Sequence, residues 1–206
     1  MSAGYAMDPV LKDLAQVAAW LVAAVGGVIA AFKAVSELKR SNKERAEALG
    51  ERREQFRWRQ AEMARTILDQ TWNDRLARSA MRMLDWSGLQ YEQGQRLTDP
   101  ISSADMWHAL RTTDTSFTPD EQFVRDCFDQ LFDYFERMEH YLGIGLINWE
   151  DIQGRLAYYA DLLARKKLVY EQFLTTYQFR LAHRLLKRFP SWSTAVEGTA
   201  PDGVAA

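Results

Sequence analysis

One stretch of the sequence carries acidic and histidine side chains at a spacing that could hold a metal ion. In DCFDQLFDYFERMEH these side chains recur at three- and four-residue steps, so on a helix they form one row: Asp126, Asp129, Asp133, Glu136 and His140, with Glu139 alongside. Carboxylate-bridged dimetal bundles use a Glu-x-x-His pair on each of two helices. Here Glu136 and His140 are four residues apart, and no Glu-x-x-His on another helix completes such a site. The row also lacks the second histidine of the zinc-peptidase motifs. We therefore interpret it as a solvated helix face and expect no metal or other cofactor.

The remaining reactive side chains do not form a recognisable site. His108 and His183 have no partner at metal-ligand spacing, and Cys127, the single cysteine, is expected to be an inert packed thiol. There is no glycine-rich phosphate loop, no Gly-x-Ser-x-Gly and no other activated nucleophile. We expect no catalytic residue and a protein that is not an enzyme.

Charge is distributed unevenly along a chain whose net charge is only −2. Residues 119–140 contain seven acids and two bases, whereas residues 154–189 contain eight bases and two acids. We expect these segments to neutralise each other within the fold. Alternatively, the basic face and the FRWR stretch at 56–59 could meet anionic lipid or nucleic acid. The near-neutral balance makes nucleic acid the weaker partner.

The acidic row needs a helix to position it, and the sequence defines that helix clearly. Thr118 at the cap, Pro119 at the first position and two acids in the first turn predict a helix from Pro119 to Leu142. Asn148, with Asp151 three residues on, predicts the start of the next helix. Apolar residues continue with helical spacing to Phe189, where Pro190 ends the pattern, so 149–189 is one helix or two.

The segments before this region are also helical. A wide apolar face from Met63 to Leu84 predicts one helix that ends near Gly88, and a short serine-capped helix is expected near Ser103–Arg111. No long period-two alternation predicts a sheet. Residues 63–190 therefore predict an all-α bundle of four to five helices, and 191–206 a disordered tail.

The run LAQVAAWLVAAVGGVIAAF, residues 14–32, contains no charge. As a helix it would extend about 28 Å, close to the roughly 30 Å hydrocarbon core of a bilayer. A buried soluble helix is an alternative because the run is rich in alanine, and a cleaved signal peptide is another. The acids before the run and Lys33 directly after it favour a retained transmembrane helix at 14–35, preceded by a short extracytoplasmic segment, 1–13.

Basic residues set the expected orientation. Lys12 is the only Lys or Arg before the run, whereas Lys33, Lys39, Arg40, Lys43 and Arg45 follow it. The positive-inside rule therefore places the N-terminus outside and the C-terminal part in the cytoplasm. A lone cysteine agrees with that reducing compartment. The layout resembles that of many bacterial inner-membrane proteins, so we expect a single-pass protein of the inner (plasma) membrane.

Small residues recur every four positions within the predicted span: Ala15, Ala19, Ala23, Gly27 and Ala31. Such a face lets two helix backbones approach closely in lipid, so we expect a homo-oligomer that associates along it. Residues 36–62 then predict a charged helical stalk, with Gly50 as its expected kink. One heptad position holds Val35, Asn42, Leu49, Phe56 and Met63, but the partner position is mostly arginine, so half of a coiled-coil seam is missing.

These features favour a membrane-anchored helical interaction or sensory protein that acts through self-association. Membrane lipid, further copies of the chain and a protein bound to the cytoplasmic bundle are its expected partners. One alternative is a membrane-active effector or toxin of a bacterial defence or toxin–antitoxin system. A weaker alternative is a metal-dependent helical enzyme that uses the acidic row.

Overall fold

The structure is a computed structural model that describes residues 9–93, 96–114 and 116–195. Before Val35 it describes the side chains of Trp20, Gly26, Gly27, Phe32 and Lys33 only. The chain divides into two compact units, Met1–Phe56 and Arg57–Ala206. Its described part is almost entirely helical, which confirms the predicted all-α class.

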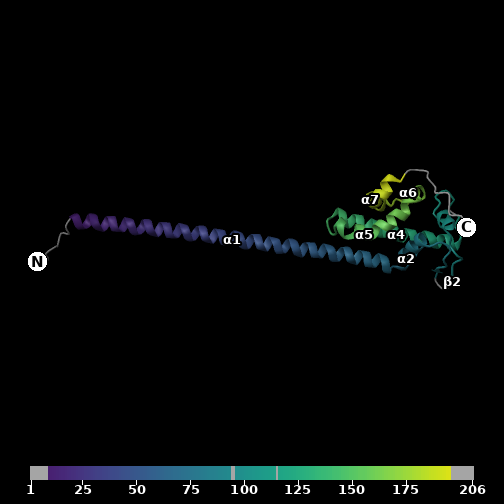
Figure 1. Ribbon diagram of the computed structural model, residues 1–206, viewed down its shortest axis with the longest axis horizontal. Helices are drawn as coiled ribbons and strands as arrows, with labels where there is room; N and C mark the ends of the chain where they lie inside the picture. The colour runs from purple at the N-terminus through teal and green to yellow at the C-terminus, as the bar shows by residue number, and fades with distance from the viewer. Residues whose placement is uncertain (1–8, 94–95, 115, 196–206) are drawn as a thin grey trace. The chain divides into compact units, whose positions relative to one another are not determined.

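The first unit contains most of the long helix α1, Pro9–Asn73 (Figure 1). Pro9 suits the first helical turn, and no proline follows until Pro100. Ion pairs one turn apart support the exposed part, with Arg40–Glu44 at 2.9 Å and Lys43–Glu47 at 3.8 Å. Helix α1 continues through Gly50, the position of the expected kink.

Among the described residues, no helix is long and apolar enough to cross a membrane. Most side chains of the predicted span at 14–35 lie outside the described residues.

The second unit contains the end of α1 and seven further helices among its described residues. They are α2 (Arg75–Asp85), α3 (Ser103–Ala109), α4 (Pro119–Gly143), α5 (Trp149–Ala164), α6 (Lys167–Thr176), α7 (Arg180–Lys187) and α8 (Pro190–Thr194). A two-stranded antiparallel hairpin of β1 (Glu92–Gln93) and β2 (Arg96–Leu97) pairs Glu92 with Leu97. We call the described part of this unit, residues 57–195, the helical domain. It has more and shorter helices than the four to five predicted.

Helix α4 supplies the centre of the core. Its aromatic rings contact rings of α6, with Phe132 6.0 Å from Phe173 and Phe128 5.7 Å from Tyr170, measured between ring centroids. All four rings are buried. The predicted start of α4 is confirmed, because the Thr118 hydroxyl accepts the Glu121 amide and the Glu121 carboxylate accepts the Thr118 amide.

The prediction of one helix from Met63 to Leu84 is wrong, because the helix is interrupted between α1 and α2. Asp74 has extended backbone angles, and its carboxylate accepts the amides of Leu76 and Ala77 at 3.0 and 2.9 Å. A new helix therefore starts at Arg75 although the apolar spacing continues across the break. Gly88 has the predicted left-handed conformation, with φ +77°, but lies beyond the end of α2 and leads into a bridge between Leu89 and Ile101.

Residues 149–189 form three helices, not one or two. After α6, Gln178 is left-handed with φ 62°, and the Phe179 amide donates to the Leu174 carbonyl at 2.8 Å. The Gln178 amide donates to Thr175, which completes a Schellman motif with glutamine where glycine is usual. The Phe179 ring stacks on Phe173 at 6.3 Å. This apolar contact helps to hold the turn without a glycine.

The predicted tail at 191–206 is wrong in its first residues. Pro190 does not end the ordered chain but begins α8, and Trp192 in this helix is completely buried. Residues 196–206 lie outside the described residues. The packed unit also begins earlier than predicted, at Arg57 and not at Met63.

Candidate functional site

The predicted oligomerisation face falls mostly outside the described side chains. Nothing is described of the side chains of Ala15, Ala19, Ala23 and Ala31. At Gly27 a Cβ atom would meet no described atom within 4 Å beyond its chain neighbours and the backbone of its own helix. A larger residue there would therefore not collide with described parts of its own chain.

Helix α4 carries the acidic row, but α7 packs over part of it. Glu136 Oε1 accepts the backbone amides of Leu181 and Ala182 at 2.6 and 2.9 Å and so caps the start of α7. Glu139 is buried and binds Arg188 through two hydrogen bonds of 2.7 and 2.8 Å. A solvated face is therefore the wrong interpretation for these two residues. Glu139 and Arg188 instead form an acid–base pair between helices.

Among the other members of the row, Asp129 is half-buried, and burial raises the pKa of its carboxyl group. Asp126 and His140 are exposed, and Asp133 pairs with Arg137 one turn further along α4. Among the described residues, no group of three His, Cys, Asp or Glu side chains is placed to hold a metal ion. Cys127 is completely buried, and burial raises the pKa of its thiol.

The FRWR stretch does not leave all its basic residues available to lipid or nucleic acid. Arg57 forms two hydrogen bonds with Asp151 of α5, at 2.5 and 2.8 Å. Gln60, one turn further along α1, donates to the Gly145 carbonyl and accepts from the Asn148 side chain. The position of Asn148 had predicted that its side chain caps α5. Instead, this side chain contacts α1 and forms no capping hydrogen bond with α5.

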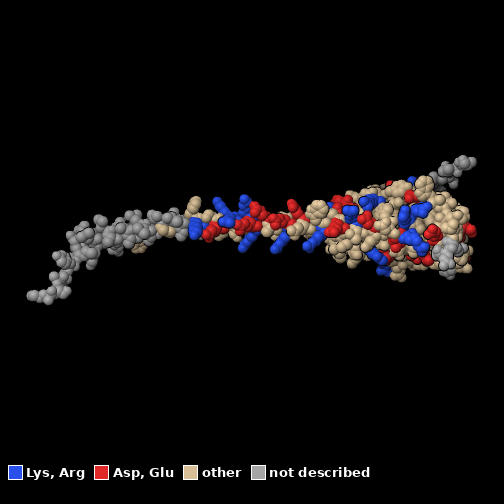
Figure 2. Space-filling model, turned by 90° about the horizontal axis from the view of Figure 1, so that it is seen from below, with Lys and Arg blue, Asp and Glu red and all other residues tan. Residues whose placement is uncertain are grey.

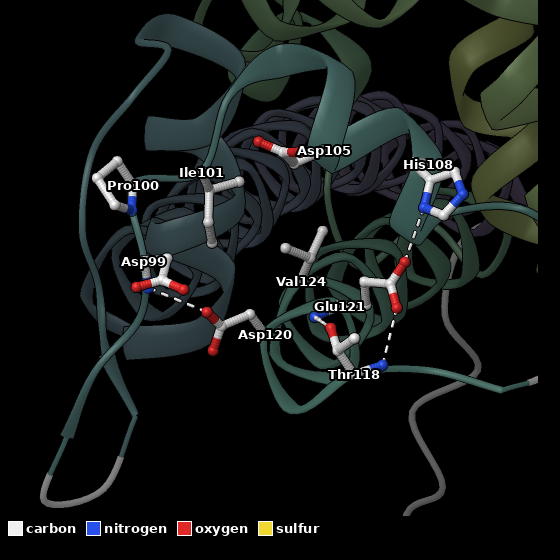
Figure 3. Close-up of a pocket in the computed structure, with 9 residues that line it drawn as sticks. All are labelled: Asp99, Pro100, Ile101, Asp105, His108, Thr118, Asp120, Glu121 and Val124. Carbon is white, nitrogen blue, oxygen red and sulfur yellow. Dashed lines mark hydrogen bonds and ion pairs between the residues drawn. The ribbon is translucent and has the colours of Figure 1, made fainter.

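A pocket of about 290 Å³ lies between the start of α4, α3 and the loop that precedes α3 (Figure 3). Glu121 is its most connected residue. Its carboxylate accepts hydrogen bonds from Arg111 at 2.5 Å and from the Thr118 amide at 2.8 Å, and lies 2.7 Å from His108 Nδ1. The Arg111 guanidinium and the Thr118 amide lower the pKa of Glu121 to about 2.

The acids of this pocket act mainly as structural groups. Asp105 accepts from the amide and hydroxyl of Ser102 and completes the capping box of α3, and Asp120 accepts the Asp99 amide at 3.0 Å. A catalytic base needs an accessible lone pair and a pKa near neutrality. Glu121 instead has its pKa near 2 and its carboxylate bound by Arg111 and Thr118. The pocket therefore joins α3 to α4 and does not resemble an acid–base site.

Sequence reasoning missed Arg125, a buried residue on α4. Its guanidinium donates to the carbonyls of Ala109 and Arg111 at 2.8 and 3.1 Å, at the C-terminal end of α3. It also lies 4.1 Å from the centroid of the Phe117 ring and 4.8 Å from that of Tyr177. A cation is favourable at this end of a helix dipole. The spacing of the aromatic residues around Arg125 in the sequence does not predict that a charged side chain is buried there.

Among the described residues, the largest set of exposed apolar side chains lies on α1. Val35, Leu49 and Phe56 are 55%, 54% and 57% exposed and fall on one heptad position. We call these three residues the α1 stripe. Lys, Arg and Glu are interspersed around it along the helix (Figure 2). In the described part of the chain, no other element covers the α1 stripe, and a second helix could pack against it.

Comparisons with protein-family models, curated proteins and solved structures found no match to this chain.

Proposed function

We propose that this chain is a membrane-anchored helical interaction protein that self-associates through α1 and holds its helical domain in the cytoplasm. The observation that carries the proposal is the α1 stripe. Val35, Leu49 and Phe56 are left in water at one heptad position of a helix of 65 residues, with the polar Asn42 between the first two. A second copy of the same helix would cover them.

The membrane part of the proposal rests on the sequence. The uncharged run at 14–32 has the length of a membrane span, and the basic residues that follow it favour a cytoplasmic C-terminal part. Arginines at the partner heptad position weaken the stripe as an independent coiled coil. Attachment of two copies to one membrane raises their effective concentration, so a weak stripe is sufficient for association.

Crosslinking of the full chain in native membranes tests the self-association. Leu49→Lys places a charge in the stripe and should reduce the crosslinked dimer several-fold. Trp58→Lys is the matched control, because Trp58 is 77% exposed but lies outside the heptad position. It should crosslink like the wild type. Equal crosslinking of both variants and the wild type would exclude the stripe as the interface.

A separate experiment tests the membrane anchor. The full chain should stay with the membrane fraction after a carbonate wash, and a periplasmic phosphatase fused after Ala206 should be inactive. Release by carbonate would overturn the anchor, and strong phosphatase activity would overturn the orientation.

A further inference from the structure

Three arginines on α2 share one face of the helix and line a pocket of about 420 Å³. Arg75, Arg78 and Arg82 are three and four residues apart, so their side chains are neighbours on the helix surface. Gln90, Tyr91 and Glu92, from the hairpin region, also line the pocket. The buried face of α2, which includes Ala77 and Ala80, packs into the core of the helical domain. We call this cavity the α2 arginine pocket.

The arginines of this pocket differ from others in the same domain. Arg57 and Arg188 each hold a carboxylate through two hydrogen bonds. Among the described residues, Arg75, Arg78 and Arg82 form no ion pair with a carboxylate and no side-chain hydrogen bond. Glu92 is the only acid in the lining. Three cations therefore share one concave surface with a single anion.

Tyr91 fixes part of the pocket wall. Its backbone amide donates to the Thr98 hydroxyl at 3.0 Å, and its carbonyl accepts the Thr98 amide at 2.9 Å. The Arg82 guanidinium lies 5.7 Å from the centroid of the Tyr91 ring, and Tyr91 is only 3% exposed. The Tyr91 hydroxyl is buried without a hydrogen-bond partner among the described residues. A rigid aromatic ring thus restricts one of the three guanidinium groups before any ligand arrives.

Guanidinium groups match phosphate oxygens because they offer two parallel N–H donors and keep their charge at all relevant pH values. A volume of about 420 Å³ is that of a small-molecule site, not of an extended nucleic-acid groove. Glu92 and Gln90 supply acceptors for the hydroxyl groups of such a molecule. We propose that the α2 arginine pocket binds a small soluble molecule through two linked phosphate groups, as in a nucleoside diphosphate.

This ligand site is independent of the proposed self-association, since it uses α2 and the hairpin and no residue of the α1 stripe. Titration calorimetry on the purified full chain in a neutral detergent tests it, with inorganic pyrophosphate and ADP as separate probes. Saturable binding of at least one probe, weakened by added salt, is the expected result.

Substitutions then locate the binding. Arg78→Gln should weaken the affinity by about tenfold or more, because a charge-assisted hydrogen bond to the ligand is lost. Arg78→Lys should fall between this variant and the wild type, because it keeps the charge but loses the planar fork. Arg184→Gln removes one exposed cation elsewhere in the domain and should bind like the wild type. Thermal unfolding of each variant checks that the fold is intact.

Three results would overturn the proposal. The first is the absence of saturable binding of both probes to the wild type. The second is an equal loss in Arg78→Gln and Arg184→Gln, which would mean general attraction to a basic surface. The third is arginine-dependent binding to phosphatidylglycerol vesicles without binding of either soluble probe, which would assign the pocket to a lipid headgroup.

Discussion

The buried carboxylate of Glu139 on α4 accepts hydrogen bonds from Nε and Nη2 of Arg188, the C-cap residue that follows α7. The Glu139 side chain is 2% exposed, whereas that of Arg188 is 41% exposed. The two partners are therefore not equivalent. Loss of the arginine leaves a charge in the protein interior, whereas loss of the acid leaves an arginine that can reach water.

Arg188→Leu should accordingly be the more destabilising of the two single changes. We expect it to lower the free energy of unfolding by roughly 3 kcal/mol, because it leaves an unpaired buried carboxylate. Glu139→Leu should cost less, and Glu139→Leu combined with Arg188→Leu should be more stable than Arg188→Leu alone. Denaturant unfolding of the four proteins measures this cycle, and additive effects would argue against the coupling.

Glu121 should make the domain sensitive to acid. Its pKa is lowered from 4.5 to about 2. A carboxyl group with a lowered pKa stabilises the fold above its unfolded pKa, and this stabilisation is lost as the pH falls toward the folded pKa. The wild type should therefore be more stable than Glu121→Gln at pH 6, and the difference should shrink between about pH 4.5 and pH 2.

Melting temperatures measured across this pH range test the effect of Glu121. Asp161→Asn is a suitable control, because Asp161 is exposed on α5. It should preserve the wild-type pH dependence. A constant difference between Glu121→Gln and wild type at every pH would show that Glu121 acts by packing and not by charge.

Gln178→Gly should stabilise the domain. Gln178 has φ 62°, a conformation that costs a residue with a side chain about 1 kcal/mol relative to glycine. Its side chain is exposed, so little packing is lost. The same change at Gln172, exposed within α6, should instead destabilise by up to about 1 kcal/mol. Opposite shifts in melting temperature are the expected result, and parallel shifts would contradict it.

Gly27→Leu tests the small-residue face predicted within the membrane span. The substitution keeps the segment apolar, and beyond its chain neighbours and its own helix backbone no described atom lies within 4 Å of the position of its Cβ. It should reduce crosslinked oligomers in native membranes without preventing insertion, because a bulky side chain holds two helix backbones apart. Val28→Leu, on a neighbouring face, should have little effect. If Gly27→Leu crosslinks as well as the wild type, the small-residue face only reflects the high alanine content of the segment.

Local signals predicted local structure well. Thr118 and Pro119 start α4 as expected, and Ser102 caps a short helix in the expected place. The breaks at Asp74 and Gln178 were harder to detect, for different reasons. Asp74 is a good capping residue, but the apolar spacing continues past it. Gln178 occupies a position where the expected signal is glycine.

Contacts between distant segments could not be predicted from spacing. Arg57 and Asp151 are 94 residues apart, and nothing near either residue indicates the other. Likewise, the sequence shows the acidic row on α4. Which residues of this row α7 covers depends on how the whole domain packs, and the spacing does not predict it. The arginine spacing on α2 is readable in the sequence, whereas the contribution of Tyr91 requires the hairpin.

The burial of Trp192 in α8 has a consequence for synthesis of the protein. Translation proceeds from the N-terminus, so α1 emerges first, and the helical domain lacks one of its largest core side chains until the ribosome has passed residue 192. A chain cut short before that point would keep α1 but expose the apolar surface that Trp192 covers. Quality-control proteases recognise such surfaces, so survival of the domain depends on translation past Trp192.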